Sequence, residues 1–101
     1  METPDGSLHV LVIEDERVVA KDLQHTLTRL GYRVPLTVAT GAAALEAVSK
    51  SCPDLVIMDI RIEGEVDGIE TAELLRKRFD VPVVFLTAYA DQATIARAKR
   101  I

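Results

Sequence analysis

Apolar residues recur along the chain in short runs that alternate with stretches of helical spacing. Residues 8–13 form a short apolar run of strand length, and the stretch after it carries Val19, Leu23, Leu27 and Leu30 at helical spacing. Gly31 follows the last of these turns, at a position where a glycine commonly ends a helix. The pattern therefore predicts a strand followed by a helix.

A second strand is predicted over residues 33–38, followed by a helix that carries Leu45 and Val48. Pro35 lies inside this strand and has no backbone N–H, so it cannot donate a hydrogen bond to a neighbouring strand. We therefore expect this strand at an edge of the sheet.

Two later runs, residues 55–58 and 83–86, are apolar without alternation. Continuous apolar runs are typical of strands that are buried on both faces of a parallel sheet. The helix predicted between them has an apolar side made of Ile69, Ala72, Leu75 and Phe79. A further helical stretch begins near Asp91, so the chain contains four strand-helix units in succession.

This succession predicts an α/β fold with a doubly wound parallel sheet, because right-handed crossovers between parallel strands place helices on both faces. The whole chain, residues 1–101, is expected to form one domain with a flexible polar start at residues 1–7. In such sheets ligands bind outside the carboxyl ends of the strands, where the strand order reverses.

Composition and charge exclude several classes of function. The formal net charge is −4 at pH 7, so this segment has no basic field for binding nucleic acid or an anionic membrane surface. The single cysteine, Cys52, cannot form an internal disulfide, and no stretch of about 20 apolar residues predicts a membrane span. We therefore expect a cytoplasmic location.

Polar residues follow three of the predicted strands. Glu14 and Asp15 come after the first strand, Asp59 ends the third, and Thr87 with Ala88 ends the fourth. Carboxylates gathered at one edge of a sheet repel one another unless a cation lies between them. Magnesium suits this arrangement, because it prefers oxygen ligands and is usually held by one or two carboxylates together with phosphate oxygens.

With magnesium bound, Asp59 can attack a phosphoryl donor and form an aspartyl phosphate, while hydrogen-bond donors offset charge on the phosphoryl oxygens. Thr87 is placed to supply one such hydroxyl. Each of these residues alone has an ordinary structural interpretation as a turn, helix-start or strand residue. Their joint placement at successive strand ends favours phosphoryl chemistry.

The order of these motifs resembles the receiver domain of bacterial two-component response regulators over nearly the whole chain. In that family an acidic pair follows the first strand, the phosphoacceptor aspartate ends the third, and Thr or Ser with a small residue ends the fourth. The matching residues are Glu14-Asp15, Asp59 and Thr87-Ala88. The resemblance implies the flavodoxin-like receiver fold and a phosphoryl group taken from a sensor histidine kinase or a phosphotransfer domain.

The resemblance also implies further site residues. Asp67-Gly68 matches an Asp-Gly pair that opens the third helix in the family. The implied magnesium ligands are Glu14, Asp15, Asp59 and the main-chain carbonyl of Arg61. The Arg61 side chain would border the phosphate site, and Tyr89 lies where family members tune the access of water to the phosphoryl group.

The chain departs from the family pattern in two places. Residues 60–66 lack the proline that commonly follows the phosphoacceptor, so we expect a different loop shape and metal affinity. The family's fifth strand ends in a lysine that contacts the bound phosphoryl group, and no residue takes that role here. Lys99 lies in a helical stretch and is interpreted as solvated surface. The sequence thus predicts four strand-helix units with the fifth missing.

Loss of the fifth unit is expected to weaken phosphorylation and to leave the fourth strand as an unpaired edge. We therefore hypothesise a truncated or clipped chain that self-associates through residues 83–86 or through the last helix. The parent protein is expected to be a transcription factor, a hybrid histidine kinase or another multidomain signalling protein.

Three alternative functions make different demands on the site. An aspartate-nucleophile hydrolase needs a second acid two residues after the nucleophile, where this chain has Arg61. A flavin-binding module needs a loop rich in Gly, Ser and Thr after the first strand, and the acidic residues 14–16 would repel the flavin phosphate. The strongest alternative is a receiver-like interaction module that has lost phosphorylation, because the lysine is missing. The favoured function is self-modification, without enzymatic turnover.

The remaining polar residues have structural interpretations. His9 and His25 lack a metal-binding companion at useful spacing, and Cys52 precedes a proline in a turn. The alternating charges of residues 70–78 are typical of a solvated helix face.

Overall fold

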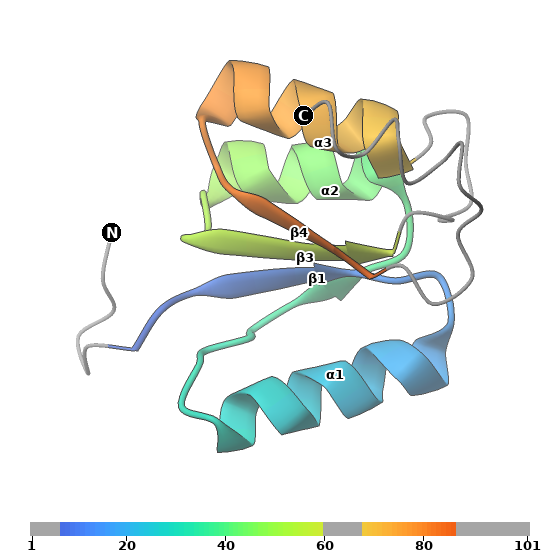
Figure 1. The fold of residues 1–101 in the computed structure, drawn as a ribbon, viewed down its shortest axis with the longest axis vertical. Coiled ribbons are helices and arrows are strands. Elements are labelled where there is room, and N and C mark those ends of the chain that lie inside the picture. The colour runs from blue at the N-terminus through green and yellow to red at the C-terminus, as the bar shows by residue number, and fades with distance from the viewer. Residues whose placement is uncertain (1–6, 60–67, 87–101) are drawn as a thin grey trace.

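The computed structural model describes residues 7–59 and 68–86, which form a parallel sheet with helices on both faces (Figure 1). In chain order the elements are β1 (Val10–Ile13), α1 (Arg17–Arg29), β2 (Thr37–Val38), α2 (Gly41–Lys50), β3 (Leu55–Asp59), α3 (Gly68–Phe79) and β4 (Val83–Leu86). The predicted alternation of strands and helices is confirmed over these residues. The helix predicted near Asp91 lies outside them, as do the first six residues.

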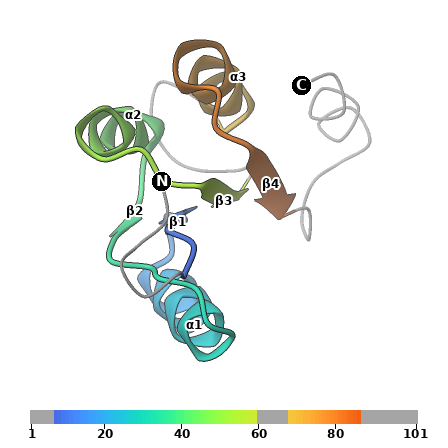
Figure 2. The same ribbon diagram turned by 90° about the vertical axis from the view of Figure 1, so that its left-hand side faces the viewer.

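The strands run parallel in the order β2-β1-β3-β4. α1 covers one face of the sheet, and α2 and α3 lie side by side on the other (Figures 1 and 2). The chain leaves β1 toward β2 and then returns to β3 on the opposite side of β1, so the strand order reverses between β1 and β3. The predicted doubly wound α/β fold is confirmed, and this reversal is where such folds bind ligands.

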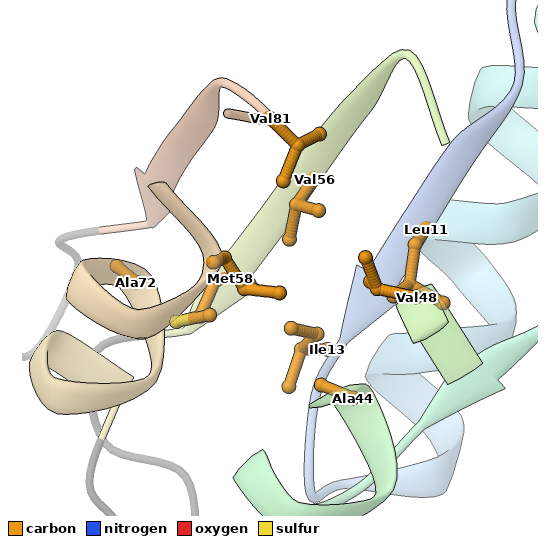
Figure 3. Close-up of a cluster of buried hydrophobic side chains, with 9 residues drawn as sticks. Leu11, Ile13, Ala44, Val48, Val56, Met58, Ala72 and Val81 are labelled. Atoms are coloured by element: carbon orange, nitrogen blue, oxygen red, sulfur yellow. The ribbon is translucent and has the colours of Figure 1, made fainter. Parts of the chain in front are cut away.

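Alternation along the strands divides the core into two layers. The larger layer lies between the sheet and the pair α2 and α3, and it contains Leu11, Ile13, Ala44, Val48, Val56, Met58, Ala72, Leu75 and Val81 (Figure 3). The smaller layer lies under α1 and contains Val10, Val12 and Val34. Each fully buried aliphatic side chain contributes about 1.5–3 kcal/mol. This burial is the main term that holds β1 and β3 together at the centre of the sheet.

β2 is shorter than the sequence predicts. The predicted range 33–38 is wrong at its start, since only its last two residues pair with β1 as a strand. Pro35 has no N–H to donate, so the ladder is interrupted there. Farther back, Arg33 forms an isolated bridge with His9. The predicted position of this strand at a sheet edge is confirmed.

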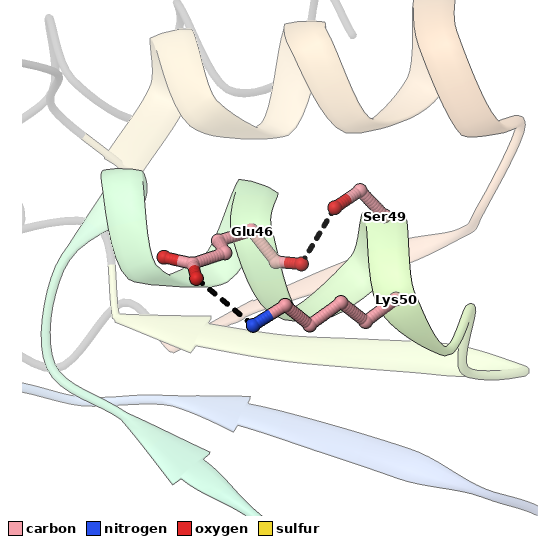
Figure 4. Close-up of polar contacts among 3 residues, drawn as sticks. All are labelled: Glu46, Ser49 and Lys50. Atoms are coloured by element: carbon pink, nitrogen blue, oxygen red, sulfur yellow. Dashed lines mark hydrogen bonds and ion pairs between the residues drawn. The ribbon is translucent and has the colours of Figure 1, made fainter.

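α2 begins at a capped end and carries one exposed ion pair. Thr40 precedes the helix, and its Oγ1 accepts a hydrogen bond from the N–H of Ala43 at 3.1 Å. Near the other end, Lys50 Nζ lies 3.0 Å from Glu46 Oε1, and Ser49 Oγ donates to the Glu46 carbonyl oxygen (Figure 4). An exposed pair at this spacing contributes about 0.3–0.5 kcal/mol. The helix is therefore held mainly by its packing on the sheet.

α1 ends where the sequence places a glycine. Gly31 adopts a φ of 100°, a left-handed conformation that side chains with a Cβ rarely adopt. α1 is the longest of the three described helices, and none of the three combines the length and the apolar composition needed to cross a bilayer.

Asp54 fastens the start of β3 to the start of β1. Its Oδ2 accepts a hydrogen bond from the main-chain N–H of His9 at 2.8 Å, and its own N–H donates to the His9 carbonyl oxygen at 2.8 Å. The hydrogen bond from His9 holds the pKa of Asp54 below its usual range, because it stabilises the charged carboxylate. β1 itself begins at Val10, so the predicted range 8–13 is wrong at its start.

We expect Asp54→Ala to lower the free energy of unfolding by about 1 kcal/mol near pH 7, the usual net value of one hydrogen bond. A carboxylate whose pKa is lowered on folding stabilises the folded state above its unfolded pKa. That contribution is lost as the pH falls through the folded pKa. Urea unfolding curves of the variant and the parent chain should therefore converge in acid.

Asp22→Ala is the matched control, since it removes an exposed carboxylate from α1. We expect it to change the free energy of unfolding by less than about 0.5 kcal/mol. An equal loss of stability in both variants would contradict the role assigned to Asp54.

Candidate functional site

The end of β1 holds one buried carboxylate. The N–H of Glu14 donates to the Val38 carbonyl oxygen at 2.9 Å, so the main chain stays in the sheet one residue beyond β1. The Glu14 side chain is only 6% exposed, and its Oε2 accepts a hydrogen bond from the N–H of Asp15 at 2.9 Å. Burying a carboxylate is costly unless donors or a cation compensate for the lost water. This carboxylate is therefore held at the carboxyl end of the sheet.

The register of the sheet places Asp59 beside this position. Ile13 pairs with Met58 across β1 and β3, and Asp59 pairs with Leu86 across β3 and β4. One step beyond the first of these pairs, Glu14 and Asp59 stand at the same level of two neighbouring strands. The structure thus brings their main chains together at the point where the strand order reverses.

Asp15 lies in the connection between β1 and α1. α1 begins only at Arg17, and its N-cap residue, Glu16, makes no side-chain capping hydrogen bond. Asp15 is half-buried between the strand and this helix start. The first polar residue after the apolar run of β3 is Asp59, the last residue of that strand. Asp15 therefore follows β1 and Asp59 ends β3, and in both strands preceding residues are buried in the core.

The donor set at this edge suits a hard divalent cation. Glu14 and Asp15 are adjacent in the chain and supply carboxylate oxygens, which magnesium prefers as ligands. Among the side chains that the structure describes, no three of His, Cys, Asp or Glu are grouped so that they could hold a metal ion. The side chain of Asp59 and the carbonyl of Arg61 lie outside the part of the chain that is described. The magnesium site therefore stays a prediction.

Several other predicted site residues also lie outside the described residues. They are Arg61, Asp67, Thr87, Ala88, Tyr89 and Lys99. Gly68, the second residue of the predicted Asp-Gly pair, is buried and begins α3. The roles assigned to these residues stay predictions.

The histidines and the cysteine lie away from the edge of the sheet that carries Glu14 and Asp59, which we call the carboxylate edge. His9 is at the opposite, amino-terminal end of the sheet, where burial, and after it the positive charge of Arg33, lowers its pKa. His25 is exposed on α1, and Cys52 is exposed in the turn before β3, where its Sγ donates to the Pro53 carbonyl oxygen. These positions agree with a structural interpretation of all three residues.

The structure also shows a groove that the sequence did not single out. It lies beside Glu14, between α1 and β2, with Arg17 and Lys21 on its helix side. These two residues are four positions apart and therefore lie on one face of α1. Their spacing is a signal in the sequence, but the sequence does not show which strand that face meets.

Comparison with known proteins identifies the family of this chain. The family model of the response regulator receiver domain matches residues 10–101. The chain belongs to this family, so it is a receiver domain of the kind found in bacterial two-component signalling. The predicted family and the flavodoxin-like receiver fold are both confirmed.

Three relatives illustrate the similarity. Over 79 residues the chain is 46% identical to the uncharacterized transcriptional regulatory protein YrkP of Bacillus subtilis, covering 78% of this chain and 33% of that protein. The structure of the signal receiver domain of a modulated diguanylate cyclase from Desulfovibrio desulfuricans matches with a TM-score of 0.87 and 36% identity, covering 93% of this chain and 75% of that one. The anti-anti-sigma factor PhyR from Bartonella quintana matches with a TM-score of 0.71 and 26% identity, covering 78% of this chain and 32% of that one. The chain spans about a third of the length of the curated relatives that it matches.

Proposed function

We propose that this receiver domain accepts a phosphoryl group on Asp59 from a phosphohistidine of a sensor histidine kinase or a phosphotransfer domain. One observation carries the proposal. Glu14 and Asp59 stand at the same level of neighbouring central strands, with Asp15 next in the chain, in a member of the receiver family. Doubly wound sheets bind their ligands at this reversal of the strand order.

The proposed transfer exchanges one bond to phosphorus for another. A carboxylate oxygen of Asp59 attacks the phosphorus, and the bond from phosphorus to the donor's imidazole nitrogen breaks. That nitrogen keeps the electron pair and takes up a proton. Magnesium, when bound, would offset charge on the phosphoryl oxygens. Its proposed ligands are Glu14, Asp15, Asp59 and the main-chain carbonyl of Arg61.

Residues that follow β4 are proposed to respond to the phosphoryl group. The hydroxyl of Thr87, with small Ala88 beside it, donates to a phosphoryl oxygen, while Arg61 and Tyr89 border the site and tune the access of water. The added charge then biases a two-state region around Thr87. The domain modifies itself in this way and does not turn over a substrate. We place it in the cytoplasm, within a longer signalling protein.

Magnesium is expected to be required for phosphorylation by a small donor such as acetyl phosphate. Removing it with a chelator should slow incorporation about 100-fold or more, because a metal ion supplies several kcal/mol of charge stabilisation. Asp15→Asn should raise the magnesium concentration needed, whereas Asp22→Asn on α1 should not. Intact mass measured over time follows both effects. Incorporation that ignores the chelator would contradict the proposed site.

The alternative function is a protein-interaction module that works without phosphorylation. Its support is the similarity to PhyR of Bartonella quintana, which is named an anti-anti-sigma factor. If neither the chain nor a longer parent protein gains a phosphoryl group from acetyl phosphate or a kinase, this alternative is favoured. If only the longer protein gains the phosphoryl group, the phosphoacceptor function stands. In that case residues of the longer protein outside this chain are needed for the reaction.

We also expect self-association through β4. Within the described residues β4 is an edge of the sheet, and Val84 at its centre is 49% exposed. Exposed strand edges pair with other chains, and a lysine on the edge opposes such pairing. Light scattering should show a molar mass that rises with protein concentration. At a given concentration, Val84→Lys should have a lower molar mass than the parent chain, whereas Val18→Lys on α1 should have the same molar mass. A single-chain mass at every concentration would contradict this expectation.

A further inference from the structure

Two hollows lie along the seam between α1 and the segment that leads into β2. The first hollow, of about 390 Å³, is lined by Arg17, Lys21 and Thr37 among others. The second hollow is lined by Thr28, Arg33 and Val34 among others, and Gln24 of the first hollow lies one helical turn before Thr28. In Figure 1 the chain turns back after α1 and passes beside the helix into β2. The two hollows follow each other along this seam, and together we call them the α1–β2 groove.

The floor of the α1–β2 groove is apolar and tied together. Ala20 and Val34 are buried, and Val38 is half-buried beneath the groove. The side chain of Gln24 crosses the seam, where its Nε2 donates to the Val34 carbonyl oxygen at 2.7 Å. This hydrogen bond links the helix to the strand segment, so the floor is preformed.

The walls of the groove carry an excess of positive charge. Its exposed cations are Arg17, Lys21 and Arg33. Within the described part of the chain, none of these three forms an ion pair with a carboxylate. One carboxylate, that of the buried Glu14, lines the groove. In a chain with a net charge of −4, the groove is thus a local cationic surface.

The dimensions of the groove favour an extended occupant. Its helix side runs from Arg17 to Thr28, which corresponds to about 16 Å at the rise of an α-helix. A stretch of about five residues in extended conformation has the same length. β2 beside the groove is an edge strand, so no further strand of the described sheet covers that side.

We propose that the α1–β2 groove docks an extended acidic segment of a partner protein, with carboxylates against the cations and apolar side chains on the floor. A peptide of this kind places a few negative charges at the groove, whereas a nucleic acid would extend its phosphates over the acidic remainder of the chain. The groove lies on the flank of α1 that faces β2, and its cations take no part in the proposed phosphoryl transfer. The inference therefore goes beyond the phosphoacceptor function and does not depend on it.

Fluorescence anisotropy of the whole chain with a labelled peptide, Glu-Leu-Glu-Pro-Glu-Leu-Glu, tests this proposal. We expect saturable binding that weakens as salt is added, because the charges are exposed to solvent. The double variant Arg17→Gln, Lys21→Gln should bind about fivefold or more weakly, the sum of two exposed charge pairs. Arg76→Gln, Lys77→Gln is the matched control, since it removes the same charge from exposed positions on α3.

Peptide binding to the control variant should equal that of the parent chain. Amide shifts in NMR spectra should move at Gln24, Thr37 and Ala39 and stay unchanged along α3. Equal binding by both double variants would overturn the proposal, as would equal binding of the peptide with glutamine in place of every glutamate. A DNA oligonucleotide of the same charge that binds as tightly through Arg17 and Lys21 would also overturn it, in favour of a general polyanion site.

Discussion

Asp59→Asn is expected to abolish phosphoryl incorporation while the fold persists. Asparagine has nearly the shape of aspartate, but its amide lacks the charged oxygen that attacks phosphorus. Asp59 ends a strand whose preceding residues, Val56 and Met58, are fully buried, so the core does not depend on the carboxylate. Intact mass after incubation with magnesium and acetyl phosphate should show one added phosphoryl group on the parent chain and none on the variant.

Asp54→Asn provides the matched control for this experiment. Asp54 precedes β3, at the opposite end of the strand from Asp59. As in Asp59→Asn, the substitution replaces one carboxylate oxygen by an amide nitrogen. An asparagine there can still accept the hydrogen bond from His9 through its Oδ1. This variant should gain the phosphoryl group as the parent chain does. Incorporation into Asp59→Asn at the parent rate would place the acceptor on another residue.

Leu75→Ala is expected to lower the free energy of unfolding by about 2–5 kcal/mol, a large share of the 5–15 kcal/mol typical of a domain. Leu75 lies on α3 and is fully buried in the larger core layer, between the helix and the sheet. Truncation removes apolar contacts and leaves a cavity that neighbouring side chains fill only in part. Urea unfolding followed by circular dichroism measures the loss.

Leu30→Ala makes the same chemical change at a surface position. Leu30 caps the end of α1 and is 69% exposed. Its truncation should change the free energy of unfolding by less than about 0.5 kcal/mol. Similar losses in the two variants would show that the layer beneath α2 and α3 is not the main source of stability.

The buried part of the fold was predictable because burial leaves a clear pattern. β3 and β4 are continuous apolar runs, and the buried residues of α3 recur at helical spacing. The errors lie at the starts of the first two strands, where the predicted range begins before the regular ladder. β1 starts at Val10 and β2 at Thr37, because hydrophobicity does not report where the ladder hydrogen bonds begin. Pro35 signalled the edge position of β2 but not its short length.

The carboxylate edge was predictable from strand ends, whereas the groove was not. Glu14 follows β1 and Asp59 ends β3, and parallel strands bring their carboxyl ends to one edge of the sheet. The α1–β2 groove instead depends on which strand one flank of α1 meets. Arg17 begins α1, whereas Arg33 lies in the connection between α1 and β2, and both line the groove. No local sequence pattern relates the two residues.

The most direct test of the central claim locates the phosphoryl group on the chain. After incubation with magnesium and acetyl phosphate, reduction with sodium borohydride converts an aspartyl phosphate into a stable alcohol, which peptide mass mapping assigns to one residue. The proposed function predicts that the reduced side chain is found at Asp59 and at no other position. Reduction at another carboxylate, or a phosphoryl group that survives at a serine, threonine or histidine, would contradict it.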